Sequence, residues 1–182
     1  MPTRASHAHA HTRPAPARSR KQDAIALLKA DHKTVSGLFK DYDKADDDRA
    51  RKIELATEIC TELTIHAAIE EEIFYPQARE ALGDDEDGAA LLDEAEVEHG
   101  SLKVLIAQIE EALDGAGPDE KTDAKVTVLK EYVEHHVKEE EKELFPMVRK
   151  SGMDLAEVGE ELRARKEELK AEGANGGMQH LT

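Results

Sequence analysis

The 182-residue chain has few aromatic residues and almost no cysteine: it contains no tryptophan, three phenylalanines, three tyrosines and one cysteine. With Cys60 alone, no disulfide can form inside the chain, which suits a reducing compartment. No apolar run approaches the roughly 18 residues needed to cross a bilayer. The arginines near the N-terminus are followed by no apolar stretch, so they do not resemble a secretory signal. We therefore expect a cytoplasmic protein.

Positive charge is also scarce, because 25 lysines and arginines face 41 aspartates and glutamates, for a net charge of −16. Five of these bases lie in the first 21 residues, which contain no acid. The remaining 20 bases against 41 acids give the rest of the chain a charge of −21. Such a surface repels phosphate backbones and anionic lipids. We expect no nucleic-acid partner and no membrane partner.

Composition divides the chain into four parts. Residues 1–21 are rich in Pro, Ala, Arg, His and Ser without periodicity, which predicts a disordered basic tail. Its alternating His7, His9 and His11 offer a loose metal chelate, but closing a mobile tail costs entropy, so a plain flexible tail is favoured. Residues 22–150 suit one helical domain, residues 153–172 an accessory amphipathic helix, and residues 173–182 a flexible tail.

Two copies of one motif organise the chain. The first is residues 65–76, Ile-His-Ala-Ala-Ile-Glu-Glu-Glu-Ile-Phe-Tyr-Pro, and the second is residues 134–146, Glu-His-His-Val-Lys-Glu-Glu-Glu-Lys-Glu-Leu-Phe-Pro. Glu70 follows His66 by four positions, Glu140 follows His136 by four, and a proline follows each histidine by ten. Residues four apart share one face of a helix. Each copy therefore presents an imidazole and a carboxylate to one point.

The segment before each copy repeats as well. Asp31-His32 precedes the first copy and Glu98-His99 precedes the second. His32 and His99 are 67 residues apart, and His66 and His136 are 70 apart. A helix with a histidine followed by a helix with HxxxE, twice over, predicts an all-α fold in which four helices form a pseudo-twofold bundle.

Hydrophobic spacing places these polar residues in the core. Apolar residues recur at intervals of three and four on each expected helix, and the histidines and glutamates fill the gaps. The apolar positions of the first helix are Ile25, Leu28, Val35, Phe39 and Tyr42, around His32. The same spacing assigns Ile73 and Met147 to the core after the two HxxxE motifs.

A metal pair explains this pattern. A lone histidine on an apolar helix face is more often a hydrogen-bonded core residue than a ligand, but four at matching heights, two with glutamate at i+4, favour metal binding. Two carboxylates buried without compensation would each cost several kcal/mol. Helical bundles hold pairs of metal ions between such side chains, with glutamates bridging the ions.

These motifs resemble those of the hemerythrin-like, or HHE cation-binding, proteins over residues 22–150. The resemblance implies an up-down-up-down four-helix bundle around two non-haem iron ions joined by an oxo or hydroxo bridge. It implies bridging roles for Glu70 and Glu140. The terminal ligands it implies are His32, His66, His99 and His136.

The sequence departs from the oxygen-carrying members at two points. Those proteins have a histidine where this chain has Lys103, a cation unfit to bind a metal, and they space the last pair as HxxxxD. The chain looks more like bacterial members that respond to nitric oxide or oxidative stress or repair iron-sulfur clusters. The resemblance implies a small diatomic or peroxide ligand, in sensing or oxidation. Alternatives are an iron donor or buffer and a structural bundle holding zinc, and enzymatic activity stays open.

Several roles stay open at this stage. His136 fits the apolar spacing and the repeat better than His135, so we prefer it as the ligand. Pro76 and Pro146 predict either a kink or a helix end. Packing is favoured for Tyr132 over a position facing the metals.

Further acids flank the motifs. Glu71 and Glu141 read as solvated, whereas Asp31 and Glu98 are candidate acceptors for the ligand histidines. Cys60 is more simply a buried small residue than a redox thiol. The C-terminal helix either docks on the bundle or forms a homodimer, and the sequence favours neither.

Overall fold

The computed structural model describes residues 22–114 and 119–175, and within these ranges all regular structure is helical. The helical elements in chain order are α1 (Ala24–Lys44), α2 (Arg49–Ile69), the π-helical segment η1 (Glu70–Phe74), α3 (Tyr75–Leu82), α4 (Glu86–Asp114), α5 (Glu120–Glu139), the π-helical segment η2 (Glu140–Leu144), α6 (Phe145–Lys150) and α7 (Leu155–Asn175). The predicted all-α class is confirmed.

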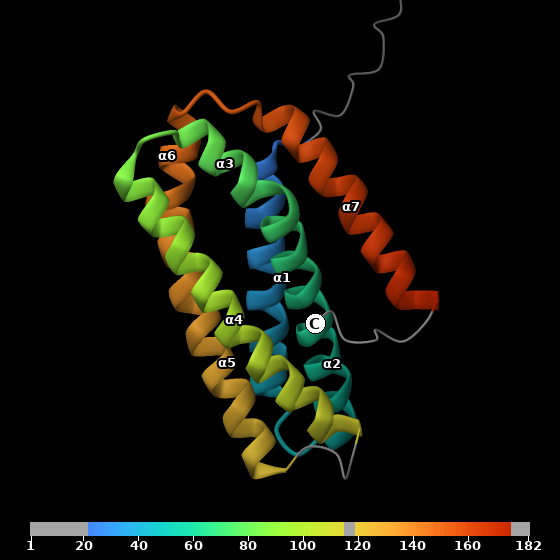
Figure 1. The fold of residues 1–182 in the computed structure, drawn as a ribbon. Helices are drawn as coiled ribbons and strands as arrows, with labels where there is room; N and C mark the ends of the chain where they lie inside the picture. Colours follow the sequence, from blue (N-terminus) through green and yellow to red (C-terminus); the bar gives the residue numbers. More distant parts are fainter. Residues whose placement is uncertain (1–21, 115–118, 176–182) are drawn as a thin grey trace, which may run out of the picture.

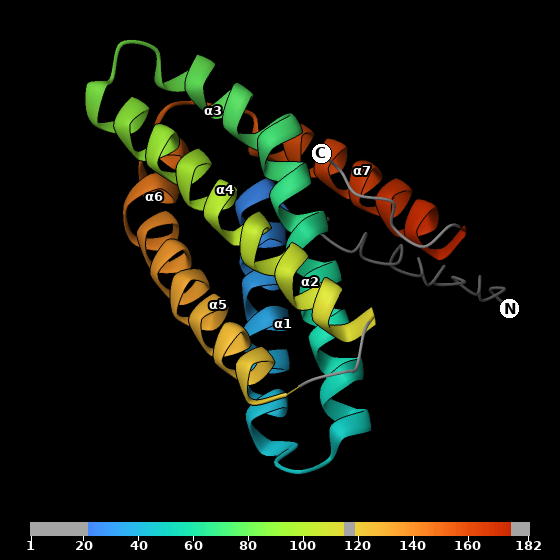
Figure 2. The same ribbon diagram turned by 60° about the horizontal axis from the view of Figure 1, so that its bottom comes forward.

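Four long helices form the predicted up-down-up-down bundle (Figures 1 and 2). Helix α1 packs on α2, α2 on α4, and α4 on α5. Side chains close the ring between α1 and α5: the Tyr42 hydroxyl donates to Asp123 at 2.6 Å, and Lys130 pairs with Asp43 at 2.7 Å. These two contacts link α1 to α5 and complete the ring of helices.

Aspartates begin all four of these helices, and at the start of α4 Asp85 accepts a hydrogen bond from Gly88 N–H at 2.9 Å. The carboxylates of Asp23, Asp48 and Asp119 accept hydrogen bonds from the backbone N–H three residues on, at the starts of α1, α2 and α5. Each satisfies a donor that has no partner in the first helical turn.

Neither proline of the repeat ends its helix. Pro76 and Pro146 lie in the first turns of α3 and α6, each directly after a π-helical segment. Proline has no N–H and its ring clashes with the carbonyl four residues back, so it disfavours a regular α-turn there. The wider π-turn accommodates this, and the chain bends where α2 passes into α3 (Figure 1). Of the two roles expected for these prolines, the structure therefore favours a kink over a helix end.

The π-segments shift the helix face by one residue. Ile73 is only half-buried, whereas Phe74 and Tyr75 are buried. In the second copy Met147 is half-buried, whereas Val148 is fully buried. The predicted core positions Ile73 and Met147 are therefore wrong, because a spacing of three and four takes no account of the extra residue in a π-turn.

Buried apolar side chains form two clusters that lie on either side of a polar layer. One includes Leu28, Ile65 and Phe74 and extends to α7, and the other includes Val35 and Leu63 toward the opposite end of the bundle. The histidines of the motifs fall between them along every helix. The core thus holds its polar side chains in one place.

Helix α7 docks on α1 and α2 of its own chain, along the outer side of the bundle (Figures 1 and 2). It buries Val158, Leu162 and Leu169, and its Arg165 pairs with Glu72 at 2.6 Å. The helix reaches three residues beyond the predicted position 172. The rest of the predicted C-terminal tail and the predicted basic tail with His7, His9 and His11 lie outside the described residues.

Cys60 is buried on α2 in the cluster around Val35. Burial, with the nearby charge of Glu110, raises the pKa of this thiol to about 12. The thiolate needed for redox chemistry is therefore disfavoured, and a packing role is favoured.

Within the described ranges, no helix joins the length and the apolar character that crossing a bilayer requires.

The docking of α7 depends on a glycine. A Cβ atom at Gly159 would lie 2.7 Å from the backbone nitrogen of Ala24 and 2.9 Å from the carbonyl carbon of Asp23. We predict that Gly159→Ala lowers the free energy of unfolding by about 1–3 kcal/mol, because rigid backbone must move. Gly100→Ala, in α4 with open space around it, should instead stabilise by about 0.5–1 kcal/mol. Urea denaturation of both variants measures this. Equal effects would show that α7 does not lie against the start of α1.

Candidate metal centre

Six buried side chains meet in the polar layer of the bundle. Each long helix supplies one histidine, and each π-segment supplies its first residue, a glutamate. None is more than 6 % exposed. They are His32 of α1, His66 of α2, Glu70 of η1, His99 of α4, His136 of α5 and Glu140 of η2. The structure thus brings together all six residues proposed from the sequence.

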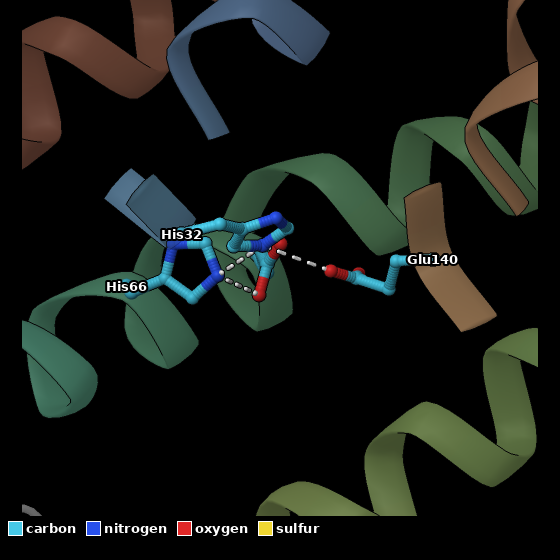
Figure 3. A group of neighbouring side chains, drawn as sticks. His32, His66 and Glu140 are labelled. Carbon is cyan, nitrogen blue, oxygen red and sulfur yellow. Dashed lines mark hydrogen bonds and ion pairs between the residues drawn. The ribbon is translucent and has the colours of Figure 1, made fainter. Parts of the chain in front are cut away.

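The histidines form two close pairs. The Nε2 atoms of His32 and His66 are 3.1 Å apart, and those of His99 and His136 are also 3.1 Å apart. Figure 3 shows the rings of His32 and His66 converging, with Glu140 approaching from another helix. Two nitrogen ligands of one first-row metal ion, each about 2.1 Å from it, lie about 3.0 to 3.4 Å apart at octahedral to tetrahedral angles. Both pairs have the spacing of ligands to a common ion.

Each buried glutamate spans both histidine pairs. Glu70 Oε2 lies 3.2 Å from His66 Nε2 and 3.5 Å from His99 Nε2. Glu140 Oε2 lies 3.2 Å from His32 Nε2 and 3.6 Å from His136 Nε2. A carboxylate that faces one histidine of each pair is placed to bridge two ions.

Outer carboxylates orient two of the rings. Glu141 Oε1 is 3.0 Å from His32 Nδ1, and Glu71 Oε1 is 3.0 Å from His99 Nδ1. These two glutamates are not simply solvated, as the sequence had suggested. A carboxylate at Nδ1 fixes the tautomer that leaves Nε2 free to bind a metal.

The other two rings also turn Nδ1 to an acid, with a hydrogen bond at His136 and a longer contact at His66. Glu98 Oε2 is 2.8 Å from His136 Nδ1, and Asp31 Oδ2 faces His66 Nδ1 at 3.7 Å. The candidate acceptors Asp31 and Glu98 therefore lie where the sequence placed them. All four histidines turn Nε2 to the centre and Nδ1 to an acid.

Lysines stand behind three of these acids. Lys29 pairs with Glu141 at 2.7 Å, and Lys103 pairs with Glu71 at 2.6 Å. Lys166 of α7 pairs with Asp31 at 2.6 Å in a largely buried contact. Lys103 is thus held by an outer carboxylate, which agrees with its exclusion as a ligand.

Burial sets the protonation of the centre. It lowers the pKa of His66 to about 4, so this imidazole is neutral at pH 7. Burial and the charge of Glu140 raise the pKa of Glu70 well above its ordinary value. Although burial opposes it, His136 and a hydrogen bond from His32 lower the pKa of Glu140 to about 2. The pKa values of the two carboxyls are therefore shifted in opposite directions, which favours the protonated form at Glu70 and the charged form at Glu140.

The donor set fits a metal pair on three further grounds. It combines imidazole and carboxylate ligands, the combination found in the metal-binding bundles. Burial lowers the pKa of His66 and of His99, which favours the neutral imidazole that binds metal ions. Glu70 Oε1 is buried with no hydrogen-bond partner among the described residues, and such an atom costs free energy unless something positive faces it.

Tyr75 belongs to the site and was missed from the sequence. Its hydroxyl donates to Glu140 Oε1 at 3.0 Å and lies 3.4 Å from His99 Nε2. Phe145 takes the equivalent place in the other half, where its ring stacks on His32 at 5.9 Å. When the two motifs are aligned on their prolines, these two residues occupy the same position. The presence of Tyr in one copy and Phe in the other was therefore the sequence feature that could have indicated a polar role for Tyr75.

The π-segments are the reason that Tyr75 reaches the centre. Tyr75 N–H bonds to Glu70 C=O, five residues back, and Phe145 N–H bonds to Glu140 C=O. In an α-helix, residues five apart point about 140° away from each other. The π-turn brings them to one face, so a glutamate and an aromatic ring both face the histidines.

The two histidines of α5 have different positions. His135 is 56 % exposed and lies against Glu98 and Glu139 at the surface, whereas the His136 side chain is buried in the centre. Tyr132 is 49 % exposed and does not face the centre.

An enclosed apolar cavity adjoins the histidines. Its volume of about 20 Å³ has room for one water-sized molecule. All four histidines line it, while Glu70, Glu140 and Tyr75 do not. Its apolar walls are Val35, Leu63, Ala67, Leu102, Ile106, Val133 and Val137. Asp31, Thr64 and Lys103 complete the lining. A small molecule there would meet imidazoles and a mostly apolar wall.

Comparison with known proteins agrees with this geometry. The sequence model described as the hemerythrin HHE cation binding domain matches residues 23–148. A solved structure of a hemerythrin HHE cation binding domain-containing protein from Mycobacterium kansasii is similar in fold, with a TM-score of 0.67 and 24 % identity over 85 % of this chain and 91 % of that one.

A curated relative from Nostoc sp. (strain PCC 7120) carries the name DNA nickase. It is 32 % identical over 123 residues, which are 68 % of this chain and 32 % of that protein. The chain thus spans about a third of the length of this relative, and the nicking activity is a property stated of that larger protein.

We predict that Tyr75→Phe lowers the free energy of unfolding by about 1–2 kcal/mol, because buried Glu140 Oε1 loses its donor. Tyr132→Phe removes the same atom from an exposed ring and should change stability by less than about 0.5 kcal/mol. Chemical denaturation of the two variants tests this. A Tyr75→Phe protein as stable as Tyr132→Phe would show that the hydroxyl does not satisfy Glu140.

Proposed function

Because this chain belongs to the hemerythrin HHE cation-binding domain family, we propose that it holds two non-haem iron ions and uses them on a small ligand such as dioxygen, peroxide or nitric oxide. The residues proposed to bind the ions are His32, His66, Glu70, His99, His136 and Glu140. Iron in this position would supply electron transfer to or from that ligand.

The pairing of the histidines supports two ions rather than one. His32 and His66 face one point, His99 and His136 face another, and Glu70 and Glu140 each reach both. One ion would leave one histidine pair unused in a buried place.

The surrounding residues hold and orient this centre. Hydrogen bonds to outer acids fix the tautomers of His32, His99 and His136, and lysines pair with three of the four acids. The Tyr75 hydroxyl holds a proton against Glu140 Oε1. These groups keep the ligand nitrogens and oxygens aimed inward before any ion binds, which lowers the cost of binding.

The cavity beside the histidines is the observation that carries a role with a small ligand. A purely structural metal site is closed and needs no adjoining space. An iron donor must release its ions, whereas these ligands are buried beneath oriented acids and lysines. The small, mostly apolar cavity instead suits a very small ligand, close to the ions and shielded from bulk water.

We predict about two irons per chain in protein purified from iron-replete cells. His136→Ala should lose at least one iron and the near-ultraviolet absorption of the ferric centre, because a buried ligand is removed. His135→Ala, whose side chain is exposed, should keep both. Elemental analysis and absorption spectra measure this. Zinc alone, or iron lost from His135→Ala and retained in His136→Ala, would contradict the proposed centre.

Helix α7 should help to retain the metal through Lys166. This lysine pairs with Asp31, which faces His66 Nδ1. We predict that Lys166→Met speeds iron extraction by a chelator about tenfold, the effect typical of losing an outer partner of a ligand histidine. Lys170→Met is the matched control, because it removes the exposed pair with Glu62 one turn further along α7. Identical extraction rates would mean that α7 does not support the site.

A further inference from the structure

A lysine-lined groove runs over the surface between α1 and α5, beside the metal centre. Its volume is about 550 Å³, and its floor includes Phe39. The charged residues that line it are Lys29, Lys33, Lys138, Lys142, Glu134 and Glu141. We call it the lysine groove. It concentrates four bases in a chain whose charge is −16.

These lysines are not explained by ion pairing. Lys29 is paired with Glu141, but Lys33, Lys138 and Lys142 have no ion-pair partner among residues 22–114 and 119–175. Lys29 and Lys33 are four apart on one helix, and so are Lys138 and Lys142 on the helix across the groove. Like charges at this spacing repel and destabilise a helix slightly. The arrangement therefore carries a cost that folding alone does not require.

The internal repeat shows that the fold does not need them. The pseudo-twofold relation that pairs His32 with His99 and His66 with His136 also pairs each groove lysine with a residue of the other half. Those counterparts are Glu96, Gly100, Ala68 and Glu72. None is basic, so the positive groove occurs on one side of the centre only.

The groove adjoins the internal cavity. His32, Val133 and Val137 line both spaces. A single layer of side chains therefore separates the lysines from the cavity that the four histidines line. Val137 is only half-buried, so this layer includes a side chain that solvent reaches.

We propose that the lysine groove collects a small inorganic anion, the class that includes superoxide and nitrite, and delivers it past Val133 and Val137 toward the histidines. This inference rests on the proposed function, whose ligand it specifies. The cavity sets the upper size, and the lysines set the charge. The four lysines outnumber the two glutamates of the lining, and an excess of one charge in a cleft raises the arrival rate of opposite ions, by about tenfold or more at low salt.

The first experiment measures how fast azide reaches the iron of the full-length protein after elemental analysis has established its metal content. Stopped-flow absorption follows azide, an anion, and nitric oxide, a neutral control, at low and high salt. The test variant is Lys33→Gln, Lys138→Gln, Lys142→Gln. We expect its azide rate to fall about tenfold at low salt and to lose its salt dependence, with the nitric oxide rate unchanged.

A second triple variant controls for net charge. Lys44→Gln, Lys121→Gln, Lys170→Gln removes the same three charges from the ends of α1 and α5 distant from the centre and from α7. Its azide rate should change by less than about twofold. Equal loss in both triples, an equally slowed nitric oxide rate, or iron that never responds to azide would overturn the inference while leaving the iron centre in place.

A further arm needs no metal. Crystals of the wild-type protein soaked in bromide should show anomalous density between Lys33 and Lys138. Bromide at other lysines with none in the groove would overturn the inference even if the chain held no iron. Absence of iron with bromide in the groove would instead count against the proposed function and leave the anion site standing.

Discussion

The burial of two glutamates at the centre of a helical bundle is the constraint on which the rest of the structure depends. Glu70 is 0 % exposed and Glu140 is 2 % exposed, and isolated buried carboxylates would each cost several kcal/mol. Successive layers of side chains surround the two glutamates and offset this cost. Four imidazoles come first, then four outer acids, then lysines that pair with three of those acids. Each layer compensates the one inside it. The outermost layer joins the site to the accessory helix, because Lys166 of α7 pairs with Asp31.

Much of this centre could be predicted from the sequence, because the chain repeats and because a helix has a fixed period. The spacing of the histidines and glutamates within the apolar pattern located all six inward side chains. The same period failed directly after each glutamate, at Ile73 and Met147. A π-turn inserts one residue that no pattern of threes and fours contains, so every position behind it rotates. The proline after each segment was a local sign of the irregularity, but it did not specify a wider turn.

The roles of the acids next to Glu70 could not be predicted from the sequence, for a different reason. Glu70, Glu71 and Glu72 are consecutive and chemically identical, yet they face the centre, His99 of α4 and Arg165 of α7 respectively. Each step along a helix turns the side chain by about 100°. What each carboxylate meets therefore depends on which helices lie around it. The same holds for Tyr75, whose role depends on a glutamate supplied from 65 positions away.

The departures from the internal repeat bear most directly on function. A repeated pair of motifs gives two equivalent half-sites, and an exact twofold would make both ions alike. Three differences break the equivalence. Tyr75 faces His99 where Phe145 faces His32, and Lys166 pairs with Asp31 whereas the exposed His135 lies beside Glu98. Among the described residues, the lysine groove borders the α1–α5 side of the centre. Hydrogen bonds and charges around ligands tune the affinity and the reduction potential of a metal ion. Two ions held in this frame would therefore sit in unequal surroundings, and an anion arriving through the groove would reach the half-site of His32 first.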